Sequence, residues 1–67
     1  MYFVDIIKQA DDATLVATLE NANDIVVRTA YKIALDEATK QERIDHATAV
    51  MVRRTCEAEL SKRVGNA

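Results

Sequence analysis

Few residues in this chain have the chemistry of a catalytic or metal site. It contains one histidine, His46, and one cysteine, Cys56. A tetrahedral zinc site needs three or four ligands, and a cysteine nucleophile needs a neighbouring base in a cleft. On one helix, ten residues apart, these two side chains point in different directions. The sequence therefore predicts no metal, no cofactor and no enzymatic activity. It places His46 on an outer face and Cys56 in the core as a small apolar residue.

Adjacent carboxylates are the other candidates for chemistry. They occur at Asp11-Asp12 and at Asp36-Glu37. Both pairs lie at expected helix ends, where carboxylates usually cap a helix or remain solvated. A glycine-rich phosphate loop is absent from the sequence, because its only glycine is Gly65. The chain carries no motif that identifies a protein family.

Basic residues suggest an alternative function in nucleic-acid binding. The expected outer side of the last helix carries Arg43, His46, Arg53 and Arg54. A dimer would present this basic stripe twice to RNA or DNA phosphates. The formal net charge of −2 argues against a dedicated nucleic-acid binder.

A helix-turn-helix is a further alternative. It requires a break at residues 21–24, with Arg28 and Lys32 on the reading helix. The turn would lack its usual glycine, and the segment around it is acidic.

Helices must position these residues, because proline is absent and Gly65 stands near the end of the chain. Residues 2–9 are predicted as a short helix, although their aromatic and β-branched side chains also suit a strand. A second helix is predicted over about residues 13–37, capped by Asp11 or Asp12. The polar cluster at residues 21–24 could bend or break it. Its predicted apolar face contains Leu15, Val16, Leu19, Ala22, Val26, Val27, Ala30, Tyr31, Ile33 and Ala34.

A capping-box pattern, Thr39 followed by Glu42, predicts the start of a third helix over about residues 40–63. Gly65 is expected to end this helix, and Glu59 and Arg63 to form an ion pair on its surface. The predicted inner face contains Ile44, Ala47, Met51, Thr55 and Ala58, and it is widened by Val52, Cys56 and Leu60. The short connection after the second helix predicts an antiparallel hairpin. The predicted fold is thus a single all-α domain over residues 1–67.

The small size of the chain predicts self-association. A lone core in a 67-residue chain supplies roughly 3–5 kcal/mol at most, so we expect two hairpins to pair as a four-helix bundle. Residues 1–38 carry three Lys or Arg against seven Asp or Glu, a net of −4, whereas residues 39–67 carry six against four, a net of +2. Expected contacts with the second copy or another partner involve Tyr2, Phe3, Ile6, Leu15, Leu19, Val26, Tyr31, Ile33 and Met51.

These features predict a small non-enzymatic protein-interaction module. It would act as a regulator, inhibitor or assembly factor by covering or bridging a site on a larger protein. The single cysteine suits a reducing cytoplasm. A basic leader and an apolar run of membrane-spanning length are both missing from the sequence, so a membrane partner is not expected.

Overall fold

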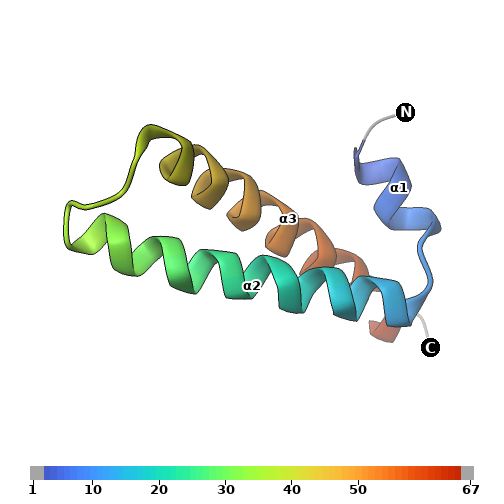
Figure 1. Cartoon of the computed structure of the whole chain (residues 1–67). Coiled ribbons are helices and arrows are strands. Elements are labelled where there is room, and N and C mark those ends of the chain that lie inside the picture. Colours follow the sequence, from blue (N-terminus) through green and yellow to red (C-terminus); the bar gives the residue numbers. More distant parts are fainter. Residues whose placement is uncertain (1–2, 66–67) are drawn as a thin grey trace.

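The computed structural model describes residues 3–65, which form three α-helices: α1 (Phe3–Gln9), α2 (Asp12–Ala34) and α3 (Lys40–Gly65). α2 and α3 pack against each other as an antiparallel hairpin, and α1 lies at the open end of that hairpin, next to α3 (Figure 1). The predicted all-α hairpin with a short N-terminal helix is therefore confirmed. Tyr2, which the sequence analysis placed in an interface, lies outside the described residues.

α2 begins where the aspartate pair predicts. The carboxylate of Asp11 accepts a hydrogen bond from the backbone N–H of Thr14 at 2.7 Å, which makes Asp11 the N-cap. The side chain of Thr14, together with this backbone bond, holds the pKa of Asp11 below its usual value, because both stabilise the ionised carboxylate. The helix then continues without a break through residues 21–24, so the sequence alternative of two shorter helices is wrong.

α2 ends three residues earlier than predicted, at Ala34. Asp36 has a left-handed backbone with φ 56°. The N–H groups of Asp36 and Glu37 bond back to the carbonyls of Ile33 and Lys32, at 3.0 and 2.9 Å. This is the Schellman pattern of helix termination, in which glycine is the usual left-handed residue. The stop was missed because an aspartate, which tolerates this conformation better than most residues, takes the place of glycine.

α3 begins with the predicted capping box. The Thr39 hydroxyl accepts from the Glu42 N–H at 3.1 Å, and the Glu42 carboxylate accepts from the Thr39 N–H at 3.0 Å. At the other end the helix includes Gly65, whose φ is not positive. α3 is therefore two residues longer than predicted.

The core of the hairpin is narrow. From α2 it takes Leu15, Ala22 and Val26, which are buried, with Leu19 and Ile33 half-buried. Val16, Val27 and Tyr31 of the predicted α2 face are exposed. The apolar face of α2 is thus wider than the contact that α3 makes with it. From α3 the core takes Ala49 and Cys56, with Val52 and Leu60 half-buried beside them.

The predicted inner face of α3 is only partly right: Val52, Cys56 and Leu60 do pack in the core, but Ile44, Ala47, Met51 and Ala58 are exposed. Ile44 and Met51, its two largest members, are 49% and 55% exposed. α3 carries two apolar stripes on different sides, and the one with the small residues Ala49 and Cys56 faces α2. We call the other the outer stripe; it consists of Ile44, Ala47, Met51, Thr55 and Ala58. Periodicity alone gives both stripes the same helical spacing, so it cannot rank them.

The molecule is thin. Its principal extents are 43 × 23 × 16 Å, and a helix with its side chains is about 10–12 Å across. Most of the hairpin is therefore one helix thick, with both broad faces uncovered. In the described part of the chain, no helix combines the length and the apolar character that crossing a membrane requires.

Candidate functional site

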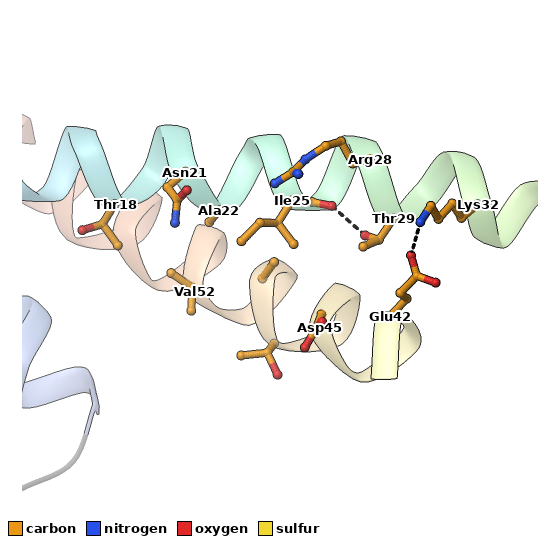
Figure 2. A pocket seen from close by; sticks show the side chains of 12 residues that line it. Thr18, Asn21, Ala22, Ile25, Arg28, Thr29, Lys32, Glu42, Asp45 and Val52 are labelled. Carbon is orange, nitrogen blue, oxygen red and sulfur yellow. Dashed lines mark hydrogen bonds and ion pairs between the residues drawn. The ribbon is translucent and has the colours of Figure 1, made fainter. Parts of the chain in front are cut away.

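A groove runs between α2 and α3 along one broad face of the hairpin. It encloses about 450 Å³. Its apolar floor is formed by Ala22 and Ile25 of α2 and by Ala49 and Val52 of α3. Figure 2 shows the Ile25 side chain projecting from α2 into this space, above Val52. The groove is thus an open apolar surface, and within residues 3–65 no third helix covers it.

The two edges of the groove carry opposite charges. Arg28 and Lys32 lie on the α2 edge, and Glu42 and Asp45 on the α3 edge. Lys32 Nζ contacts Glu42 Oε2 at 2.6 Å and joins the edges near the interhelical loop (Figure 2). Among the described residues, Arg28 pairs only with Asp24 on its own helix, at 3.0 Å, and both side chains are mostly exposed. A partner that enters the groove therefore meets a guanidinium on one edge and a carboxylate on the other.

A hydrogen bond between the helices lies next to this groove. Thr29 is buried, and its Oγ1 is 2.8 Å from Nδ1 of His46 and 2.7 Å from the carbonyl oxygen of Ile25. When the hydroxyl donates to the carbonyl, it accepts from His46, and the imidazole then carries its proton on Nδ1. The prediction that His46 lies on an outer face is therefore wrong, because α3 is rotated relative to the predicted orientation.

The sequence contained a signal for this bond. Thr29 follows Ala22 and Val26 at helical spacing, on the buried side of α2. A buried hydroxyl needs a partner, and His46 is the only histidine in the chain. Thr29 was not predicted on the buried face of α2, because only hydrophobic side chains were expected there.

The other chemically active side chain, Cys56, is fully buried. Burial raises the pKa of its thiol, because a thiolate would be poorly solvated there. This agrees with the predicted packing role of Cys56. Within residues 3–65, no cluster of three or more His, Cys, Asp or Glu side chains is placed to hold a metal ion.

The basic residues of the nucleic-acid alternative do not share one face. His46 turns toward α2. Arg53 is half-buried and reaches Asn23 of α2 at 3.4 Å. Arg43 pairs with Asp36 at 3.2 Å, near the interhelical loop. Arg54 is exposed beside the outer stripe, so the four residues do not form the expected basic face.

The residues predicted to contact a partner divide into two groups. Leu15 and Val26 are buried inside the hairpin, and Leu19 and Ile33 are half-buried there. Phe3, Ile6, Tyr31 and Met51 remain exposed. Only the second group is accessible in this structure. Ile25 and Val52, which line the groove, were not among the predicted contacts.

Arg63 makes contacts that the sequence did not suggest. Its guanidinium donates to Glu59 at 3.0 Å, as predicted, but also to Asp12 of α2 at 2.7 Å. It donates further to the carbonyl oxygens of Lys8 and Ala10, at 3.1 and 2.6 Å. These carbonyls lie at the end of α1, where helix geometry leaves them without partners. One side chain thus joins all three helices, and the bonds to Asp12 and Glu59 raise the pKa of Arg63.

Comparison with protein families, curated proteins and solved structures finds no match to this chain.

The charge of Glu42 should make the stability of the fold depend on pH. The ion pair with Lys32, followed by the hydrogen bond from the Thr39 backbone, lowers the Glu42 pKa from 4.5 to about 2. A depressed pKa in the folded state gives stability that is present above the unfolded value and is lost as the pH falls toward the folded value. We therefore expect the Tm to decrease between about pH 5 and pH 2.

Glu42→Gln tests this expectation. Glutamine keeps the capping-box geometry but has no charge to lose. In circular dichroism melts, the variant should be less stable than wild type at pH 7, and the two should converge near pH 2. Glu20→Gln is the control, since Glu20 is exposed and makes no ion pair within residues 3–65. A constant Tm difference between Glu42→Gln and wild type at every pH would contradict this.

Proposed function

We propose that this chain is a non-enzymatic protein-interaction module that works as a homodimer, with two hairpins paired groove to groove. The observation that carries the proposal is the groove itself, with its uncovered apolar floor and its edges of opposite charge. A hairpin one helix thick buries little apolar surface. Pairing two grooves would bury Ile25 and Val52 of each copy and complete a four-helix bundle.

The charges of the groove suit a second copy. A two-fold axis that runs along the hairpin places α2 of each copy over α3 of the other, in antiparallel orientation. Because this axis is parallel to the helices, each residue keeps the same position along the helix direction in the second copy. Thr29 lies opposite His46 and Lys32 opposite Glu42, so Arg28 is level with the segment just after Asp45. Each Arg28 then reaches Asp45 of the other copy, and the interface contains this pair twice.

The existing partners of these two side chains do not oppose this exchange. The Arg28–Asp24 pair is an exposed i,i+4 contact, and Asp45 accepts one exposed hydrogen bond, from Gln41 at 2.9 Å. Exposed pairs of this kind contribute little to stability. Arg28 can therefore turn to a carboxylate across the interface at small cost.

The dimer would act by covering or bridging a site on a larger protein, as a regulator, inhibitor or assembly factor. A rigid bundle of helices suits this role because its surface is preorganised before binding. We place it in the cytoplasm, where a single buried thiol such as Cys56 stays reduced.

A charge exchange tests the proposed dimer. In sedimentation equilibrium, wild type should be dimeric, whereas Arg28→Glu and Asp45→Arg should each be monomeric, because like charges would meet twice. When the two variants are mixed, both contacts become attractive, and a heterodimer should form. Arg53→Glu is the control, because Arg53 lies on the opposite broad face beside Asn23.

A monomeric wild type would overturn the dimer. So would variants of Arg28 and Asp45 that sediment as wild type does, or a mixture that stays monomeric. Far-UV circular dichroism on each variant separates loss of the dimer from loss of the fold.

A further inference from the structure

We infer that the outer stripe of α3, together with the hollow between α1 and α3, is a docking site for an acidic amphipathic helix of a partner protein. This site is separate from the groove, since none of the outer-stripe residues lines the groove. It would give the module a surface for a larger protein that pairing of the grooves leaves open.

The outer stripe is a straight apolar strip along α3. Ile44, Ala47 and Met51 follow one another at helical spacing, and Thr55 and Ala58 continue the series. α1 lies beside only the C-terminal part, where Val4 and Ile7 line a hollow together with Thr55 and Ala58. Ile44 and Met51 stay about half-exposed. A strip of this kind matches the apolar face of a helix, whose contacts recur every three or four residues.

Cations border the apolar strip. Lys40 and Lys62 continue its line at the two ends, and Arg54 lies beside Met51. In the part of the chain described by the structure, neither these three side chains nor Lys8 of α1 form an ion pair. The strip therefore combines apolar surface with positive charge that has no partner in the chain. The complementary ligand is apolar on one face and acidic on its flanks.

The hollow between α1 and α3 also combines apolar surface with positive charge. It measures about 410 Å³, and Val4, Ile7 and Ala58 form its apolar part. Lys8, Arg54 and Lys62 surround it. The one carboxylate on its wall, Glu59, is bonded to Arg63 at 3.0 Å. A large apolar side chain at one end of the docked helix would fit here, with a neighbouring carboxylate within reach of the cations.

The geometry favours a helix over a flat anionic surface or a nucleic acid. From Lys40 to Lys62 the site is about 33 Å long at 1.5 Å per residue, and it is a single strip wide. Phosphate backbones are bound mainly by charge and stacking. Here aliphatic side chains occupy the centre of the site, and the cations lie at its edges and ends.

Fluorescence anisotropy with a synthetic peptide tests this inference. The probe is a helix of about 18 residues, long enough to span about 27 Å, with leucine on one face and glutamate on both flanks. We expect saturable binding that weakens as salt rises. Met51→Asp should weaken binding by at least about tenfold, since it removes a central apolar contact and adds a like charge. Arg54→Glu should weaken it similarly at low salt.

The controls use matched changes elsewhere on the molecule. Val27→Asp, at an exposed valine of α2, should bind the probe as wild type does. Met51→Asp should remain dimeric, and the monomeric Arg28→Glu variant should still bind the probe peptide. The proposed dimer and the proposed docking site can therefore fail separately.

Several results would overturn the docking site. These are no binding, equal binding of a scrambled peptide of the same composition, and tighter binding of anionic phospholipid vesicles or of RNA. Binding unchanged by both Met51→Asp and Arg54→Glu would overturn it as well.

Discussion

Replacing Leu15 with alanine is expected to unfold most of the chain at room temperature. Leu15 is fully buried and packs with Ile7 of α1 and Cys56 of α3 in the core cluster at the open end of the hairpin. Leucine-to-alanine changes at buried sites cost about 2–5 kcal/mol, and a core of this size supplies at most roughly 3–5 kcal/mol in total. Urea unfolding at one fixed protein concentration, monitored by far-UV circular dichroism, measures the decrease in the free energy of unfolding.

Val16→Ala is the matched control for Leu15→Ala. The neighbouring valine is 43% exposed, so its truncation should change the free energy of unfolding by no more than about 0.5 kcal/mol. Equal losses for the two variants would show that the open end of the hairpin does not contain the core described above.

Replacing Arg63 with methionine is expected to release α1 from the hairpin. The guanidinium bonds to Asp12, to Glu59 and to the terminal carbonyls of α1. Methionine keeps the apolar length of the side chain and removes all these bonds. Without them, Ile7 alone holds α1 in the core cluster. Amide hydrogen exchange should show protection of α1 reduced by at least about tenfold, with α2 and α3 affected much less.

Arg53→Met serves as the control, because it makes the same change on the same helix. In the described part of the chain, the polar partners of the Arg53 guanidinium are Glu57, at 3.9 Å, and Asn23, and neither belongs to α1. Its variant should leave the exchange of α1 unchanged. Retained protection of α1 in Arg63→Met would show that apolar packing alone holds this helix.

Local signals in the sequence predicted the helices well. The capping box at Thr39 and Glu42 and the cap at Asp11 each act within a few residues. Such bonds depend on neighbours along the chain, so the sequence contains all the information they need. The end of α2 was missed because Asp36 adopts a conformation usually taken by glycine.

The candidate surfaces could be predicted only in part. Met51 and Tyr31 are exposed and remain available to a partner. The groove that Ile25 and Val52 line was not predicted, because a groove depends on which side of each helix faces the other.

By itself, the sequence determined the helix content, the starts of the two long helices and the hairpin connection, because spacing and capping are local properties. Only the tertiary structure decided which of the two apolar stripes of α3 faces α2. That choice depends on how closely two helices can approach, and small residues such as Ala49 and Cys56 allow a closer contact than Ile44 and Met51. The same rotation of α3 brought His46 to Thr29 and left the outer stripe uncovered.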